Sequence, residues 1–486
     1  MRKHPRLYEI SAWPWLERLS REEGRVITLG DVPPGRLDEL AHGEFDVLFL
    51  MGVWRRSGIG REIARTHPGL RSEYDRILPG WVPDDVPGSP YCIQAYEPDS
   101  RMGGWDGLDR ARRQLADRGI RVILDFVPNH TAFDHAWISS HPDRFVLGTD
   151  DDIRQAPTHF RSLQTQQGVR HVACGRDPYF DPWTDVAQLN YFNPDTRAAM
   201  LATLAQIAEH CDGVRCDMAM LVLNDVFEST WRRLLRDSWP RPHDEFWKPV
   251  GRHFTLLAEA YWGLEGRLLE LGFDYVYGKE LLDGLHAGDA GRARHALANP
   301  SADRFAWFLE NHDEPRSAAT LAPRLAASAA IVAAAPGMRF FFDGQFEGRR
   351  IKPPVQLGRW PDEPLDDNVR ALYQRVLEFT SDGLFHHDAW RLPAVSHAGD
   401  DSHHQIVAIC WRRNGEIALV AANVGHGTAQ AHVDVVADLP DGTVYDFEDH
   451  LTGTTYPWTR ESLQQRGLYV RLDAGAAHLF RVSRKS

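Results

Sequence analysis

The sequence predicts an α/β protein built as a (β/α)8 TIM barrel, with an inserted subdomain after the third strand and a C-terminal antiparallel β-sandwich. Eight short apolar runs alternate with segments of helical periodicity, which is typical of parallel strands buried on both faces. A long segment rich in Pro and Asp interrupts this alternation, and after about residue 385 short strands joined by turns replace it. The predicted barrel spans 1–134 and 191–384, the insertion 135–190 and the sandwich 385–486.

The candidate barrel strands follow one another along the chain. They lie at 7–10, 45–50, 121–127, 213–217, 254–259, 273–277, 305–310 and 338–342. Between the second and third, the segment 104–119 places apolar residues three and four positions apart, and Gly119 can end this helix. The most apolar stretch, 325–336, consists mainly of Ala and is too short to span a bilayer, so we expect a buried helix there.

The last hundred or so residues have the pattern of an antiparallel domain. The predicted strands lie at 404–412, 416–423, 429–436, 443–447 and 467–472. Asn414-Gly415 and Asp441-Gly442 are dipeptides that favour tight hairpin turns. We therefore expect a β-sandwich that follows the barrel.

Composition excludes several classes of protein. A hydrophobic content of 43% with 25% charged residues is that of a globular chain rather than a disordered one. The net charge of −13 argues against binding to nucleic acid, which needs a basic surface. The basic N-terminus is not followed by an apolar run, and the five cysteines form no C-x-x-C pair. We expect a cytoplasmic protein with reduced thiols, no membrane segment and no zinc site.

Chemistry-bearing residues follow the ends of the predicted strands, which is where barrel enzymes place their catalytic side chains. These residues are His130, Arg215, Asp217, Glu259, His312 and Asp313. The chain has no phosphate-binding loop, no H-E-x-x-H and no G-x-S-x-G motif. Paired carboxylates in a chain with 16 Trp, whose flat faces suit sugar rings, point to glycoside hydrolysis.

Four short motifs stand in an order that resembles glycoside hydrolase family 13, the α-amylase family. They are 125–130, 213–217, 258–260 and 308–313, and 186–190 is similar to an additional motif of that family's inserted domain. The resemblance covers nearly the whole chain. It implies the barrel, the insertion, the sandwich and a set of site residues.

The resemblance implies a role for each carboxylate, and each also has a plainer structural reading. Asp217 matches the nucleophile, and Arg215, two residues earlier on the same strand face, would favour its ionised form. Glu259 matches the general acid/base, and its apolar run separately predicts a desolvated carboxyl that holds a proton. Asp313 matches the carboxylate that binds sugar hydroxyls. The alternatives are a structural Asp–Arg pair, a surface Glu and a helix N-cap, respectively.

The remaining matched residues would bind the sugar. His130 and His312 match histidines that hydrogen-bond to sugar hydroxyls, and Tyr96 resembles the tyrosine that stacks on the cleaved ring. Arg316 could reach the cleft or only cap a helix. No metal-binding residue is predicted and no cofactor is required, although Asn129 matches a ligand in relatives that hold a structural calcium.

The expected activity is retaining hydrolysis of α-glucosidic bonds in oligosaccharides, by double displacement through a covalent glycosyl-aspartate. The alternatives are a transglycosylase of the same family and a non-catalytic carbohydrate-binding barrel. Many starch-acting relatives carry Lys and His three and four residues after the nucleophile, where this chain has Met220 and Leu221. We therefore expect a weak or unusual leaving-side site and a preference for short α-glucosides over starch.

Overall fold

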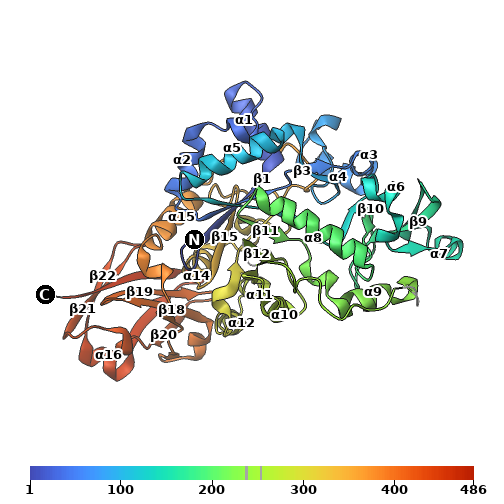
Figure 1. Cartoon of the computed structure of the whole chain (residues 1–486). Helices are drawn as coiled ribbons and strands as arrows, with labels where there is room; N and C mark the ends of the chain where they lie inside the picture. The colour runs from blue at the N-terminus through green and yellow to red at the C-terminus, as the bar shows by residue number, and fades with distance from the viewer. Residues whose placement is uncertain (236–238, 252–253, 486) are drawn as a thin grey trace.

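The computed structural model describes residues 1–235, 239–251 and 254–485. Eight parallel strands close into a barrel in the order β1-β15-β14-β13-β12-β11-β5-β2, which confirms the predicted fold class (Figure 1). Their bounds are β1 Arg6–Ser11, β2 Val47–Met51, β5 Arg121–Phe126, β11 Gly213–Cys216, β12 Thr255–Ala258, β13 Tyr275–Tyr277, β14 Phe305–Trp307 and β15 Met338–Phe342. Every predicted barrel strand therefore overlaps an observed one.

The barrel interior is a packed apolar core. Buried residues from several strands fill it, among them Leu7, Phe49, Ile123, Leu257 and Phe340. Because side chains alternate along a strand, the inward face of β1 that carries Leu7 also carries Glu9. Glu9 is completely buried, so a carboxyl group lies inside this core.

The helices outside the inserted and C-terminal domains are α1 Ala12–Glu23, α2 Pro34–His42, α3 Gly58–Thr66, α4 Pro68–Ile77, α5 Gly104–Ala116, α8 Pro194–Glu209, α9 Asn224–Leu235, α10 Glu265–Glu270, α11 Lys279–Ala287, α12 Ala290–Leu297, α13 Ser317–Thr320, α14 Leu325–Ala334 and α15 Asp367–Phe379. They mostly cover the outside of the barrel, whereas α3 and α4 pack on each other and α3 contacts the insertion. The Ala-rich α14 is buried on nearly all sides, as predicted, because its small residues pack between the barrel and strands of the C-terminal domain. None of the helices in the described part of the chain has the length and apolarity needed to cross a bilayer.

Between β5 and β11 the chain forms a separate antiparallel sheet. Its order is β6-β10-β9-β7, and β8 pairs with β9. The bounds are β6 His130–Ala132, β7 Leu147–Gly148, β8 Phe160–Thr165, β9 Gly168–Gly175 and β10 Trp183–Gln188, with the short helices α6 Ala136–Ser140 and α7 Asp150–Gln155. The first strand of this sheet begins at His130, before the predicted boundary at 135. A two-stranded sheet of β3 Trp54–Arg56 and β4 Ile93–Pro98 lies between β2 and β5 in the sequence.

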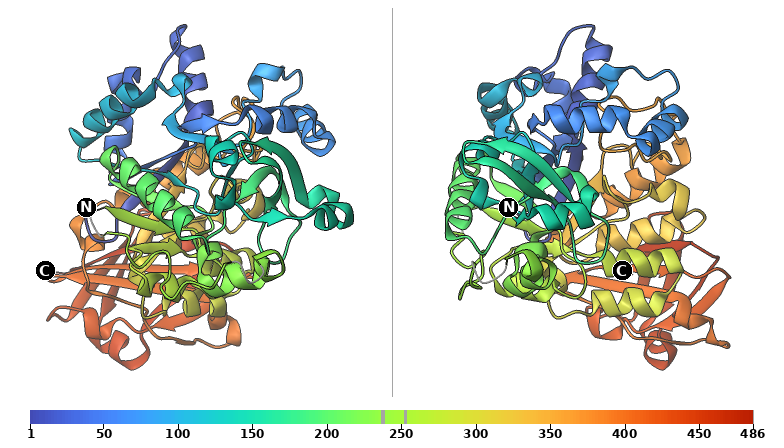
Figure 2. Two further views of the ribbon diagram at one scale, coloured as in Figure 1. Left: turned by 45° about the vertical axis from the view of Figure 1, so that its right-hand side comes forward. Right: turned by 90° about the vertical axis from the view of Figure 1, so that its right-hand side faces the viewer.

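The C-terminal residues form two antiparallel sheets around a core of their own. One has the order β16-β18-β19-β24-β21-β22 and the other β17-β20-β23. The bounds are β16 Trp390–Arg391, β17 Val395–His397, β18 Ile406–Arg413, β19 Glu416–Asn423, β20 Ala429–Val433, β21 Val444–Asp449, β22 Thr455–Thr459, β23 Leu468–Leu472 and β24 Ala477–Arg484, with α16 Arg460–Arg466. Figures 1 and 2 show these sheets and the inserted sheet on different sides of the barrel.

Candidate active site

A single buried guanidinium, that of Arg215, contacts all three predicted carboxylates. Its Nη1 lies 2.7 Å from Asp217 Oδ1, and its Nη2 lies 2.7 Å from Glu259 Oε2. Asp313 Oδ2 lies 3.8 Å from the same Nη2. The carboxylates follow β11, β12 and β14, so the strands deliver them to one mouth of the barrel.

Backbone hydrogen bonds beyond the strand ends hold Asp217 and Glu259 side by side. The Glu259 N–H donates to Cys216 O at 3.0 Å, and the Asp217 N–H donates to Phe126 O at 2.9 Å. Met218 then adopts a φ of +41°, and its own N–H donates to Glu259 Oε2 at 2.8 Å. A non-glycine residue in this left-handed region is uncommon, and such strain concentrates at functional sites.

The environment of Glu259 suits a proton donor. Its Oε1 accepts a hydrogen bond of 2.9 Å from Tyr261 Oη, and the side chain is almost fully buried. Burial raises the pKa of the Glu259 carboxyl to about 7; Arg215 opposes this shift, and the charges of Asp217 and Asp313 add to it. A carboxyl with this pKa holds a proton near neutral pH and can also release it.

His312 links Asp313 to the buried carboxyl of Glu9. Its Nδ1 lies 2.5 Å from Glu9 Oε1, and its Nε2 lies 2.8 Å from Asp313 Oδ2. Burial disfavours the charged imidazole, but the two carboxylates raise the pKa of His312 well above its usual value. Desolvation within the site opposes ionisation of Asp313, although its side chain is 46% exposed, and His312 and Arg215 hold its pKa well below the ordinary range. The ring is thus fixed as a donor to both carboxylates.

Tyr91, rather than Tyr96, lies at this site, which corrects the prediction. Tyr91 Oη is 2.7 Å from His312 Nε2, the two rings stack at 5.4 Å, and the Arg215 guanidinium lies 5.4 Å from the tyrosine ring. Tyr96 lies in β4 and points into the core. Its hydroxyl donates to Val127 O and accepts from Val127 N–H, at 3.1 and 2.9 Å. Tyr91 precedes the strand and is free to face the mouth.

Comparisons with known proteins agree with the motifs, although no family model matches the chain. An α-amylase, MalA, of Haloarcula japonica is 28% identical over 301 residues, which are 60% of this chain and 41% of that protein. The trehalose-6-phosphate hydrolase of Escherichia coli is 30% identical over 159 residues, 30% of this chain and 29% of that protein. The resemblance to glycoside hydrolase family 13 is confirmed.

The fold resembles that of solved α-amylases along its whole length. The maltogenic α-amylase AmyB of Thermotoga neapolitana superposes with a TM-score of 0.68 at 17% identity, and the match covers 99% of this chain and 98% of that one. By contrast, the chain spans less than half the length of the two curated relatives. The likeness to the α-amylase family therefore extends through the barrel, the inserted sheet and the C-terminal sheets as a fold.

His130 is buried within electrostatic reach of Asp217. It begins β6 and is buried with its ring centroid 5.4 Å from that of Trp183. Burial lowers the pKa of His130, although the charges of Asp217 and Asp185 oppose the shift. The ring is already engaged by Asn129 Nδ2, 3.4 Å from His130 Nδ1, and by a backbone hydrogen bond with Tyr91, so a contact to a sugar hydroxyl stays a prediction.

Arg316 does not reach the carboxylates that Arg215 contacts. Its Nη1 donates to Glu310 Oε1 and to Asp343 O, both at 2.8 Å, and its guanidinium lies over the Phe342 ring at 4.4 Å. It precedes α13, but its side chain makes no capping hydrogen bond there. The sequence allowed two roles for Arg316, reaching the cleft or capping a helix, and the structure shows neither. Arg316 instead forms a buried ion pair with Glu310.

The side chain of Asn129 is paired with that of Gln188. Gln188 Nε2 donates to Asn129 Oδ1 at 3.0 Å, and Asn129 Nδ2 donates to Gln188 Oε1 at 3.2 Å. The side-chain oxygen that calcium would bind is therefore already paired. Within the described ranges, the only group of His, Cys, Asp and Glu atoms close enough to share an ion lies in the C-terminal domain and excludes this region.

Proposed function

We propose that the protein is a retaining α-glycoside hydrolase that acts on α-glucosidic bonds of oligosaccharides. The observation that carries the proposal is the placement of Asp217 and Glu259 on the two terminal nitrogens of the Arg215 guanidinium, with burial raising the pKa of Glu259 to about 7. Two carboxyl groups with different protonation states are what a retaining glycosidase needs. Their separation of about 5–5.5 Å remains a prediction.

In the first step Asp217 attacks the anomeric carbon while Glu259 protonates the leaving oxygen. Asp217 Oδ1 is bound by Arg215, whereas Oδ2 has no hydrogen-bond partner among the described residues and is available as the nucleophile. Proton transfer from Glu259 removes the negative charge that would otherwise form on the leaving group. The bond to the leaving oxygen breaks as the bond to Oδ2 forms.

In the second step water attacks the glycosyl-aspartate, and Glu259, now ionised, accepts its proton. Asp313, His312 and Tyr91 border the place where the cleaved ring would lie. The ionised Asp313 can accept hydrogen bonds from neighbouring sugar hydroxyls, and the charged His312 holds that carboxylate in place, which orients the ring for attack.

A transglycosylase is the alternative within the class, since a sugar hydroxyl can replace water in the second step. A non-catalytic binding barrel is the alternative outside it, because a fold can persist without its chemistry. All three carboxylates and their contacts to Arg215 favour an enzyme. The buried, unpaired cysteines of the described residues support the proposed cytoplasmic location.

The test is turnover of α-glucosyl fluoride and maltose by the wild type, Asp217→Asn and a matched control, Asp362→Asn, whose carboxylate is exposed. We expect the first variant to lose turnover of both substrates and the control to retain it. A fluorinated α-glucosyl fluoride that slows the second step should label Asp217, as mass spectrometry of peptides would show. Full activity of Asp217→Asn, or no activity of the wild type on any α-glucoside, would overturn the proposal, and products longer than the substrate would favour transglycosylation.

A further inference from the structure

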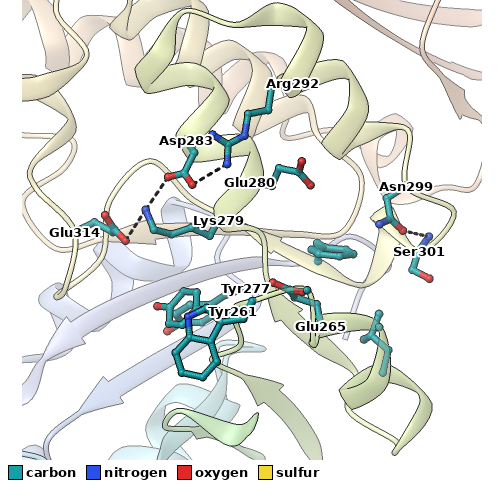
Figure 3. Close-up of a pocket in the computed structure, with 15 residues that line it drawn as sticks. Tyr261, Glu265, Tyr277, Lys279, Glu280, Asp283, Arg292, Asn299, Ser301 and Glu314 are labelled. Carbon is teal, nitrogen blue, oxygen red and sulfur yellow. Dashed lines mark hydrogen bonds and ion pairs between the residues drawn. The ribbon is translucent and has the colours of Figure 1, made fainter. Parts of the chain in front are cut away.

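A cavity of about 760 Å³ lies between α10, α11, α12 and the start of β14, and its two basic side chains already have acidic partners. Lys279 Nζ lies 2.9 Å from Asp283 Oδ1 and 3.1 Å from Glu314 Oε1. Arg292 Nη2 lies 3.0 Å from Asp283 Oδ2, as Figure 3 shows. An anionic ligand would have to break these pairs. A group of side chains in the C-terminal domain differs, because its potential ligand atoms are not paired.

This group consists of Asp401, His403 and His404. One atom from each residue, a carboxylate oxygen or a ring nitrogen, lies within 4.8 Å of the other two. The rings of His403 and His404 lie 3.9 Å apart, centroid to centroid. Asp401 and His404 are exposed to solvent and His403 is half-buried, so an ion in solution can reach the group.

The three side chains have ring contacts but no hydrogen bond or ion pair with any residue that the structure describes. In particular, His403 Nδ1 is buried and has no hydrogen-bond partner among those residues. A buried polar atom without a partner costs free energy and is rare in folded proteins. A metal ion is a partner that a neutral imidazole nitrogen can take.

The segment that carries the group is anchored on both sides. It is the 3-10 helix Asp401–Gln405, which contacts β17, β20 and α12. The Gln430 N–H of β20 donates to Ser402 Oγ at 2.9 Å. Arg294 of α12 donates from Nη1 to His404 O at 3.2 Å. These contacts hold the ligand-bearing backbone in place before any ion binds, which lowers the entropy cost of binding.

Two imidazoles and one carboxylate form a donor set for a divalent transition-metal ion, whereas calcium and magnesium prefer oxygen ligands. Zinc binds histidine nitrogen and carboxylate oxygen at about 2.0–2.2 Å in a tetrahedron, which places neighbouring donor atoms roughly 3.3 Å apart. Small rotations of the side chains would bring atoms that now lie within 4.8 Å to that separation. The cysteine pattern predicts no zinc site built on thiolates, and this donor set contains no cysteine.

We propose that Asp401, His403 and His404 bind one zinc ion, with water at the remaining position of the tetrahedron. The ion stabilises the C-terminal domain, because the anchored segment presents the three ligands together in the folded chain and binds zinc more tightly than the unfolded chain does. The site uses none of the residues proposed for catalysis, so the inference is independent of the proposed function.

The experiment titrates ZnCl₂ into the full chain, freed of metal with a chelator and carrying no affinity tag, by isothermal titration calorimetry. The variants are Asp401→Asn and His403→Ala. The matched control is His243→Ala, whose side chain is 98% exposed and lies beside a single carboxylate, that of Asp244. We expect one equivalent of zinc in the tightest class for the wild type and the control, and an affinity about tenfold or more lower in each variant. Zinc should also raise the Tm of the wild type and the control more than that of the variants.

Equal zinc affinity in the wild type and both variants would overturn the assignment, because the binding would then belong to other members of the chain's 23 histidines. Calcium or magnesium binding as tightly as zinc would also overturn it. Far-UV circular dichroism without metal checks that each variant folds. Asp401→Asn keeps the size of an exposed side chain and removes only its charge, so it decides the question even if His403→Ala does not fold.

Discussion

Replacement of Tyr261 by Phe should change the pH dependence of the reaction in a defined direction. Tyr261 Oη donates to Glu259 Oε1 at 2.9 Å, and burial keeps the pKa of this tyrosine well above its ordinary value, so the hydroxyl remains a donor. Such a hydrogen bond stabilises the charged carboxylate more than the neutral acid. Its removal therefore raises the pKa of Glu259.

The size of the shift follows from the strength of that bond. A hydrogen bond to a charged group contributes about 1.5–3 kcal/mol, and one pKa unit corresponds to about 1.36 kcal/mol, so the upper limit is about 1–2 units. Arg215 and the Met218 N–H still bind Oε2 in the variant, and they retain most of the stabilisation of the carboxylate. We expect a rise of roughly one unit from the wild-type pKa of about 7.

The assay is kcat/KM on maltose across about pH 5–9, because a natural leaving group requires the acid. The proposed acid must be protonated, so activity falls as the pH rises through the pKa of Glu259, and this limb should lie at higher pH in Tyr261→Phe. Tyr373→Phe is the control, since it also removes a buried hydroxyl, which lies in α15 and accepts a hydrogen bond from Gln345 rather than contacting Glu259. A limb that stays in place or moves to lower pH in a folded variant would refute the reasoning.

Four further substitutions test other contacts of the site. Glu259→Gln should lose about 10²–10⁴-fold in kcat on maltose but far less on an aryl α-glucoside with a good leaving group, and equal losses would remove it from the acid role. Glu9→Gln should lower the free energy of unfolding in urea by more than ~1 kcal/mol, because His312 loses a buried charged partner. Because the pKa of His312 is raised in the folded state, the difference in free energy of unfolding between the wild type and Glu9→Gln should be at its full size below about pH 6.5. It should disappear only as the pH rises through the folded-state pKa of His312. A difference that stays constant at all pH values would contradict this reasoning. Tyr91→Ala should lower kcat/KM, whereas Tyr96→Phe should cost about 1–3 kcal/mol of stability with kcat/KM retained, and the reverse pattern would restore Tyr96 to the site.

The barrel strands, which are buried on both faces, could be predicted from the sequence, whereas the edge strand β22 and the central strand β24, which is only partly buried, were not. The barrel strands are continuous apolar runs, and such runs can be recognised in the sequence without knowledge of the fold. By contrast, β22 is an edge strand that contains Pro457 and is largely exposed, so it has no apolar pattern to detect. The observed β14 ends at Trp307, earlier than predicted, because the following residues leave the ladder to form the loop that carries Asp313.

The same contrast holds for the site. Asp217 and Glu259 are predictable because each stands at the end of an apolar run, where polarity changes abruptly. Glu9 is not, because it lies within such a run, and its partner His312 is 303 residues away in the sequence. Tyr91 and Tyr96 lie in one short segment, and β4 begins between them, at Ile93. Tyr91 precedes the strand and faces the barrel mouth, whereas Tyr96 lies within it, so the choice between them depends on where the strand begins.

The charges around Arg215 account for both roles of Glu259 in the proposed reaction. Before attack, the guanidinium is shared by Asp217, Glu259 and the more distant Asp313, so an ionised Glu259 would add a further negative charge to a buried cluster with too few cations. Repulsion from Asp217 contributes to its raised pKa. Formation of the glycosyl-aspartate converts Asp217 to a neutral ester at the same moment that Glu259 gives up its proton. Arg215 then has one competing carboxylate fewer, the ionised Glu259 is stabilised, and the group that served as the acid is ready to act as the base.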